Sequence, residues 1–91
     1  MEKKEMTLIY YHVPEDRDDP DVPNMFTIPI SKNNIKLAHI YQYFPLKGTY
    51  TFRFKFAHEG FIVWLDVADP ISKLPLFKDR IYVKATRLSW T

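Results

Sequence analysis

The chain has 91 residues, of which 46% are hydrophobic and 16% aromatic, a composition typical of one folded domain and not of a disordered segment. It has no cysteine, which excludes disulfide bonds and thiolate zinc sites, and no apolar run near the ~18 residues that a membrane-spanning helix needs. The net charge of +2 hides an asymmetry: residues 1–22 carry seven acids and three bases (−4), and residues 23–91 carry four acids and ten bases (+6).

A first strand is predicted over residues 7–13, "TLIYYHV", because they are rich in β-branched and aromatic side chains. Residues 14–23, "PEDRDDPDVP", form the acidic loop, since three prolines block regular structure there. Five of the eleven acids lie in this loop. Two interpretations of it stay open: a solvated segment, or a negative patch that meets a positive patch on another copy of the chain.

A second strand is predicted over residues 24–30, "NMFTIPI", which alternate in polarity. Pro29 cannot donate a ladder hydrogen bond, so this strand belongs at a sheet edge or ends there. A helix of about two to three turns follows, with Asn34 as the best candidate cap and Pro45 as its stop. Its apolar stripe recurs at helical spacing and consists of Leu37, Ile40, Tyr41 and Phe44.

The clearest strand pattern is in residues 49–57, "TYTFRFKFA", where aromatic side chains face one way and Thr51, Arg53 and Lys55 the other. "HEG" predicts a tight turn into a strand over residues 61–67. That strand is unusual, because its apolar run from Phe61 to Leu65 is unbroken and puts Ile62 and Trp64 on the face that should be polar.

The remaining segments complete one α+β domain. An irregular connection is expected to place Leu74, Leu76 and Phe77 in the core, before a last strand over residues 81–90. The order β-β-α-β-β-β with one helix predicts a β-grasp, a five-stranded mixed sheet with a single covered face. In this arrangement the first and last strands are central, and strands 24–30 and 61–67 are the two edges.

Few residues suggest chemistry. His12, His39 and His58 match no metal-binding spacing, and the two glycines cannot form a phosphate-binding loop. The carboxylates cluster in one loop, which is a poor place to hold an acid–base pair at fixed separation. We therefore expect no enzyme activity, no metal site and no cofactor.

Nucleic-acid binding is a less favoured alternative, suggested by the interleaved aromatic and basic residues of "YTFRFKF". A stacking platform needs exposed aromatic rings beside cations. Strand alternation sends Arg53 and Lys55 outward and the aromatic side chains inward, so we expect no nucleic-acid partner.

The edge strands favour a protein-interaction module. Strand 61–65 carries no charge, and Ile62 with Trp64 would form an exposed apolar patch beside unpaired backbone groups. Two different edges on one domain make a heterologous contact that repeats head to tail. The alternative is that the connection over residues 68–79 folds across this strand and covers it.

The stretches "FTIPISKNNIKLAHI", "GTYTFRFKF", "GFIVWLDV" and "KLPLFKDRIYVKATRL" resemble the DIX domain of Dishevelled and Axin over nearly all of residues 7–88. The resemblance implies a ubiquitin-like fold that polymerises head to tail. It places the head surface on Asn24, Met25, Phe26 and Thr27 and the tail surface on Phe61, Ile62, Val63 and Trp64. Dishevelled has a tyrosine at the position of Asn24 and a basic residue at that of Trp64, which indicates a distant member.

The expected function is therefore a self-associating scaffold that clusters signalling or polarity proteins, with itself and other DIX-like domains as partners. The alternative is a Phox/Bem-type β-grasp adaptor that joins acidic and basic surfaces. We expect a single domain over residues 1–91 with an ordered core of about residues 6–90, cut from a larger protein. The expected location is the cytoplasm, in puncta or at the cell cortex.

Overall fold

The computed structural model describes residues 5–91, and its elements follow the predicted order of two strands, a helix and three strands. Two short 3-10 turns, Pro14–Asp16 and Lys32–Asn34, precede β2 and α1. Each strand lies within one or two residues of its predicted bounds. The elements are β1 (Thr7–His12), β2 (Asn24–Ile28), α1 (Leu37–Tyr43), β3 (Thr49–His58), β4 (Phe61–Asp66) and β5 (Ile81–Ser89).

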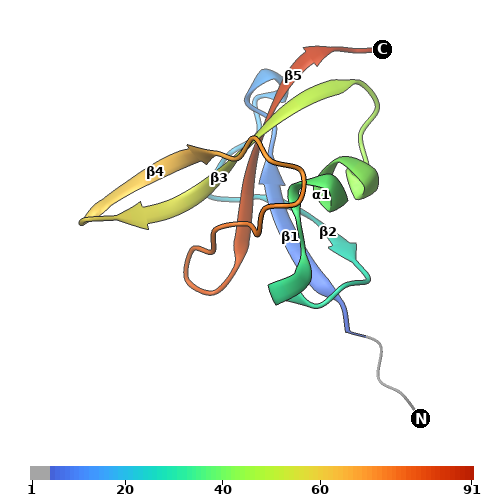
Figure 1. Ribbon diagram of the computed structural model, residues 1–91. Coiled ribbons are helices and arrows are strands. Elements are labelled where there is room, and N and C mark those ends of the chain that lie inside the picture. The colour runs from blue at the N-terminus through green and yellow to red at the C-terminus, as the bar shows by residue number, and fades with distance from the viewer. Residues whose placement is uncertain (1–4) are drawn as a thin grey trace.

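The five strands form one mixed sheet in the order β2-β1-β5-β3-β4. The central strands β1 and β5 are parallel, and every other neighbouring pair is antiparallel. The predicted β-grasp is therefore confirmed, with β2 and β4 as its two edges. Figure 1 shows these edges on opposite sides of the molecule, β2 beside α1 and β4 on a hairpin arm that projects away from the helix.

The helix covers one face of the sheet, and its C-cap residue Phe44 lies at the centre of an aromatic cluster. The Phe44 ring contacts Tyr11 of β1 and Tyr50 and Phe52 of β3, with ring centroids 4.8–5.1 Å apart. Edge-to-face pairs of this kind add roughly 0.5–1.5 kcal/mol each beyond the area they bury. The predicted aromatic row of β3 is thus confirmed as the floor under the helix.

The helix begins three residues beyond the predicted cap. Asn34 belongs to a 3-10 turn, and Ile35 is extended and fully buried, so the chain enters the core before it can coil. Lys36 occupies the N-cap position, and its N–H donates to Nδ1 of His39 at 3.0 Å. The predicted cap at Asn34 is therefore wrong, whereas the stop before Pro45 is confirmed.

The connection between β4 and β5 departs from the prediction at Phe77. Leu74 is buried and Leu76 packs against the core, as expected. Phe77 instead packs against Tyr82 on the opposite face, with ring centroids 5.9 Å apart. The cause is a tight turn closed by two backbone hydrogen bonds between Phe77 and Arg80, which reverses the chain and turns the ring away from α1.

Candidate functional site

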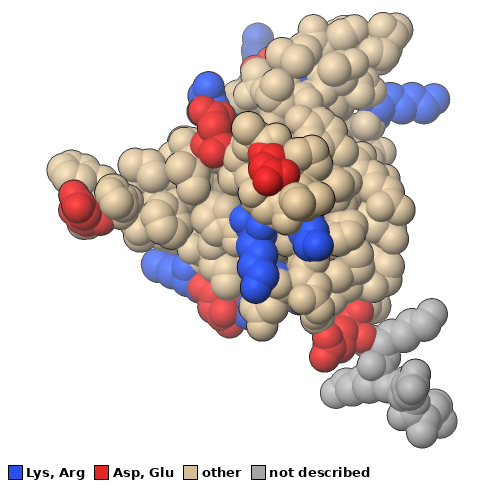
Figure 2. All heavy atoms as spheres, viewed as in Figure 1, with Lys and Arg blue, Asp and Glu red and all other residues tan. Residues whose placement is uncertain are grey.

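The free edge of β4 is bare on both of its faces. In the described chain β4 pairs with β3 alone, in a register that sets His58 opposite Phe61 and Lys55 opposite Trp64. Phe61 is 72% exposed and Ile62 is 63% exposed. These neighbouring side chains point to opposite faces of the sheet, so neither face of the strand is covered there. In Figure 2 the arm that projects to the left is mostly uncharged, with acidic atoms near its tip. The edge strand β4 therefore exposes a large apolar side chain on each face of the sheet.

The length and position of α1 explain why the side chains of β4 on the helix side of the sheet are also exposed. The helix has only seven residues and lies near β2, at the other end of the sheet. Phe61 and Leu65 share the helix side of the sheet, yet Leu65 remains 39% exposed. The alternation of the sequence puts both residues on one face of the strand, and the short helix does not extend far enough to cover them.

Trp64 is less exposed than predicted. Its ring lies on the sheet face opposite α1, 5.4 Å from the ring of His12 and 5.7 Å from Nζ of Lys84. Pro20 and Pro23 of the acidic loop line the small hollow beside it. The predicted exposed patch of Ile62 and Trp64 is therefore reduced to Ile62, because Trp64 is half-buried against neighbouring strands.

The connection over residues 68–79 does not cover β4. It packs instead against the start of α1, where the carbonyl of Pro70 accepts a hydrogen bond from the N–H of Ala38 at 3.0 Å. The backbones of Lys73 and Lys36 pair as an isolated antiparallel β-bridge, and the side chain of Leu74 is buried in the core. The covering role considered for this segment is thus wrong, and the strand edge stays accessible.

The second edge, β2, mixes exposed side chains with one anchored ring. Asn24, Met25 and Thr27 are exposed, and β2 pairs with β1 alone in the described residues. Phe26 is half-buried, and its ring lies 5.6 Å from Tyr11 and 5.9 Å from Phe44. Phe26 therefore fixes β2 to the aromatic cluster, whereas Met25 and Thr27 are free to meet a partner.

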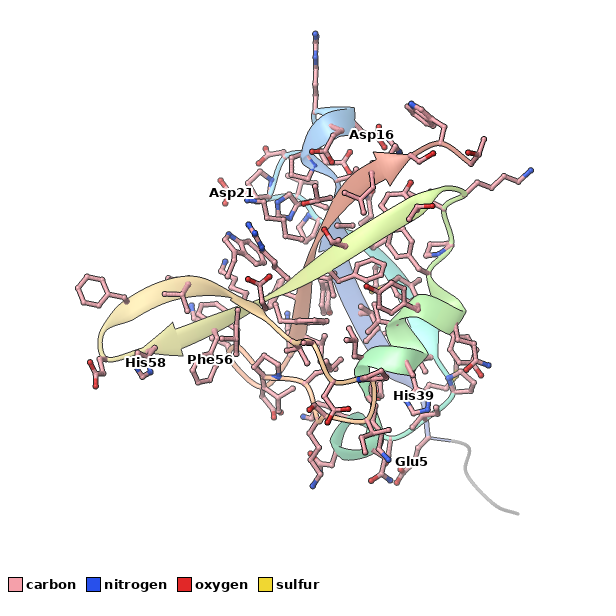
Figure 3. The ribbon with its side chains drawn as sticks, turned by 45° about the horizontal axis from the view of Figure 1, so that its top comes forward. Glu5, Asp16, Asp21, His39, Phe56 and His58 are labelled. Atoms are coloured by element: carbon pink, nitrogen blue, oxygen red, sulfur yellow. The ribbon has the colours of Figure 1, made fainter. Side chains whose placement is uncertain are left out.

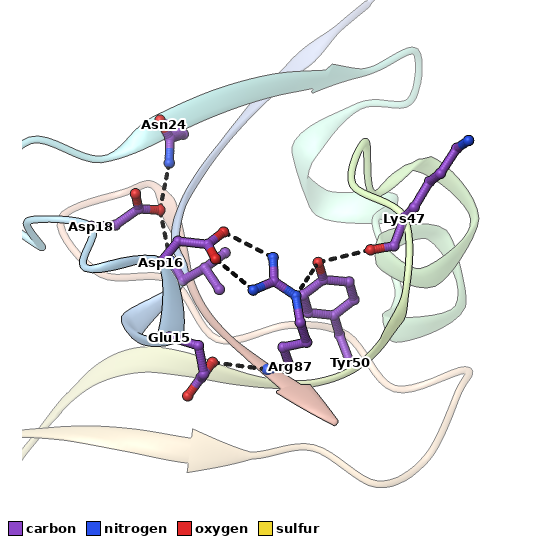
Figure 4. Close-up of polar contacts among 8 residues, drawn as sticks. Glu15, Asp16, Asp18, Asn24, Lys47, Tyr50 and Arg87 are labelled. Atoms are coloured by element: carbon purple, nitrogen blue, oxygen red, sulfur yellow. Dashed lines mark hydrogen bonds and ion pairs between the residues drawn. The ribbon is translucent and has the colours of Figure 1, made fainter. Parts of the chain in front are cut away.

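The acidic loop is fastened to the sheet through Arg87 of β5. The guanidinium donates to both carboxylate oxygens of Asp16 and, at 3.1 Å, to the hydroxyl of Tyr50 (Figure 4). The backbone N–H of Arg87 donates to Glu15 at 2.9 Å, and Trp90 stacks on the guanidinium 3.7 Å from its ring centroid. Hydrogen bonding from Arg87 holds the pKa of Asp16 below its ordinary value.

The same loop also reaches the start of β2. The carboxylate of Asp18 accepts hydrogen bonds from the backbone N–H of Val13 and from Nδ2 of Asn24, both at 2.9 Å. Three of the five loop acids, Glu15, Asp16 and Asp18, thus bind groups that lie outside the loop. The picture of a simply solvated segment is incomplete, because the loop orders the entry to the β2 edge. This contact could not be predicted from local sequence patterns, since Asp16 and Arg87 are 71 residues apart.

The three histidines lie on different elements: His12 on β1, His39 on α1 and His58 at the end of β3 (Figure 3 labels the last two). Within residues 5–91 no three metal-binding side chains gather into a cluster. No helix in this part of the chain has the length and apolar character needed to cross a membrane.

His12 is expected to make the stability of the domain sensitive to mild acid. It is 8% exposed, and burial lowers its pKa below 6.5, with Lys84 and Lys55 lowering it and Asp18 opposing them. The unfolded chain therefore binds the proton more readily, so stability is full above about pH 6.5 and falls as the pH drops through the folded pKa. We expect urea midpoints to decrease from pH 7.5 to pH 5.5, and His12→Gln to flatten that decrease.

The urea midpoints of wild type and His12→Gln would also be measured at pH 8, where His12 is neutral in the folded and in the unfolded state. An unchanged slope in His12→Gln would assign the acid sensitivity to other groups.

The sheet order and the single covering helix define a ubiquitin-like fold of the DIX type. A family model for the DIX domain matches residues 6–85, so the chain belongs to the DIX domain family. Among known structures, the chain is similar to a SOSEKI polymerising domain, solved as a SOK4 mutant, with a TM-score of 0.71. That match covers 92% of this chain and 98% of the other at 15% identity, which supports the fold alone. A search of curated proteins gave no match.

Proposed function

We propose that this domain is a scaffold module that self-associates head to tail, with β2 of one copy beside β4 of the next. The observation that carries the proposal is the pair of unlike free edges, one of which has large apolar side chains exposed on both faces. An uncharged exposed edge strand is a liability that proteins normally blunt with charge, proline or a cover. Its presence here favours a role in pairing.

Strand pairing between copies would extend the sheet across the contact. Backbone N–H and C=O groups supply adhesion in such an interface, and the side chains of the two edges supply selectivity. Because the two edges differ, the contact is heterologous and leaves one edge free at each end. Repetition then gives a filament or a ring. DIX-family membership and the likeness to a domain described as polymerising both support this reading.

The edge residues divide into two roles. In the tail, Phe61 and Ile62 are exposed enough to be buried by a partner, whereas Val63 and Trp64 are half-buried and shape the strand. The matching head residues are Asn24, Met25, Phe26 and Thr27, of which Phe26 acts as the internal anchor.

The DIX family is not a catalytic family, and assembly itself would be the activity. A polymer concentrates whatever is linked to each copy, so weak individual contacts become effective together. Signalling or polarity proteins in the cytoplasm, in puncta or at the cell cortex, are the clients we propose. Other DIX-like domains could add to the chain ends through the same edges.

Light scattering over a concentration series tests the proposal. We expect the mean mass to rise continuously past that of a dimer, with no plateau. Growth should weaken little between low and high salt, since apolar and backbone contacts are screened far less than ion pairs. A mass that stays monomeric at high micromolar concentration would refute self-association. A mass that collapses with salt would favour the Phox/Bem-type joining of charged surfaces instead.

A further inference from the structure

The face of the sheet opposite α1, the open face, carries two rows of side chains that run across four strands. The registers of β1, β5, β3 and β4 align the first row as Tyr10, Tyr82, Lys55 and Trp64. They align the second row as His12, Lys84, Arg53 and Asp66. The centre of this face therefore presents three adjacent cations and a single acid.

Like charges face each other directly in the second row. Lys84 of β5 is the cross-strand partner of Arg53 on β3, an arrangement that destabilises a sheet. Only Arg53 is neutralised, by an ion pair with Asp66 at 3.0 Å. Lys84 keeps its charge without an ion pair in the described residues, and a local rule broken in this way is typical of functional surfaces.

Several cations of the open face lie over aromatic rings. Tyr10 and Tyr82 stack with centroids 5.1 Å apart. The Lys55 ammonium lies 4.7 Å from the Phe77 ring and 5.4 Å from the Tyr82 ring. Arg80 lies 5.5 Å from the Tyr10 ring, which adds a cation at the end of the first row. Rings placed beneath the cations restrict their movement and hold them in a fixed pattern.

Lys55, Arg80 and Lys84 have no acidic partner within 4 Å in residues 5–91. Of the acids in the acidic loop, Glu15 and Asp16 are engaged by Arg87 and Asp18 by Asn24. Within the described residues, the open face thus carries three cations that no ion pair neutralises.

We propose that the open face binds an acidic peptide segment of another protein, whose carboxylates pair with Lys55, Lys84 and Arg80. The charge excess calls for an anion, and a chain of carboxylates at peptide spacing can reach cations of both rows. This site lies on a face and not on an edge, so it does not depend on polymerisation. In a polymer it would be repeated in every copy, where clustering strengthens a weak contact.

A nucleic acid fits this face less well. Single strands gain affinity by stacking bases on exposed rings. Here Tyr10, Tyr82 and Trp64 are half-buried, and cations lie over their rings. A carboxylate needs only the ammonium and guanidinium groups that lie over these rings, and not the ring faces themselves. The open face therefore favours the peptide.

Fluorescence anisotropy with a labelled octaglutamate peptide tests the site at low salt. We expect wild-type protein to bind it, and the double variant Lys55→Gln/Lys84→Gln to bind at least about tenfold more weakly. The matched control is Lys47→Gln/Lys73→Gln, which removes the same charge from exposed positions off this face and should change affinity less than about twofold.

Three outcomes would overturn the proposal: no binding to wild type, equal loss in both double variants, or tighter binding of a uridine octamer that depends on Lys55 and Lys84. The last would make the face a nucleic-acid site. Thermal melts check folding, and we expect the Lys55→Gln/Lys84→Gln variant to melt close to wild type, since relief of the repulsion with Arg53 offsets the lost contacts with the aromatic rings. Scattering on the same variant separates this site from self-association, which should persist.

Discussion

Replacing Ile62 with aspartate is expected to stop growth of the assembly while leaving the fold intact. Ile62 is 63% exposed in the single chain, so a charge there is solvated and costs little stability. In the proposed interface the same carboxylate would be buried without a partner, which costs several kcal/mol. A loss of about 2.8 kcal/mol corresponds to a hundredfold weaker contact. Light scattering should therefore report a monomer at concentrations where wild type forms long assemblies.

The matched control is Ile71→Asp. Ile71 is 71% exposed but lies in the β4–β5 connection, off both edges, so its variant should assemble like wild type. Trp64→Asp is a poorer probe, because Trp64 packs on His12 and its loss would also disturb the fold. Equal assembly of wild type and Ile62→Asp would remove β4 from the interface.

Replacing Arg87 with glutamine is expected to release the acidic loop and cause a large loss of stability. The Arg87 side chain is 7% exposed and binds Asp16 through two oxygens. Its removal leaves Asp16 and the Tyr50 hydroxyl without their donor, and breaks the stacking on Trp90. We expect the melting temperature to fall by about 5 °C or more, since that is the scale of one strong interaction in a domain of this size.

Trypsin provides a local readout of the same change. The bond after Arg17, in the middle of the loop, should be cleaved much faster in Arg87→Gln than in wild type, because local opening exposes it. Arg53→Gln is the control: Arg53 also pairs with an aspartate, but both side chains are largely exposed, so its loss should shift the melt by only about 2 °C or less. Unchanged cleavage after Arg17 would show that Arg87 does not hold the loop.

The sheet could be predicted because its information is local. The alternation of β3 sets Tyr50, Phe52 and Phe54 on one face, and the structure buries all three. The turn "HEG" provides Glu59 and Gly60 at positive φ, as a tight hairpin needs. Given the element order, the β-grasp follows, and with it the assignment of β2 and β4 as edges.

The features that could not be predicted depend on contacts distant in sequence. Asp16 and Arg87 meet only because β1 and β5 are neighbours in the sheet. Phe77 leaves the core because of a turn through Lys78 and Asp79, which adopt a left-handed conformation that sequence rules reserve for glycine. Phe61 is exposed because α1 is short. The length of a helix is difficult to predict from a sequence that has no strong N-cap residue.

The candidate tail surface could be predicted from the continuous segment 61–65, because an uncharged edge segment with apolar residues on both faces is rare. The open face was not, since its rings and cations come from four strands and a turn. Strand alternation correctly separated Arg53 and Lys55 from the aromatic residues of β3. It could not show that Tyr10, Tyr82 and Phe77 arrive on the basic face from other segments.

Mixing two blocked variants tests the head-to-tail arrangement most directly. Met25→Asp places a charge on the head edge and Ile62→Asp on the tail edge, so each protein alone should be monomeric in sedimentation velocity. An equimolar mixture retains one intact head and one intact tail, and should form a one-to-one dimer that grows no further. A mixture that stays monomeric, or a single variant that still assembles, would contradict a contact between unlike edges.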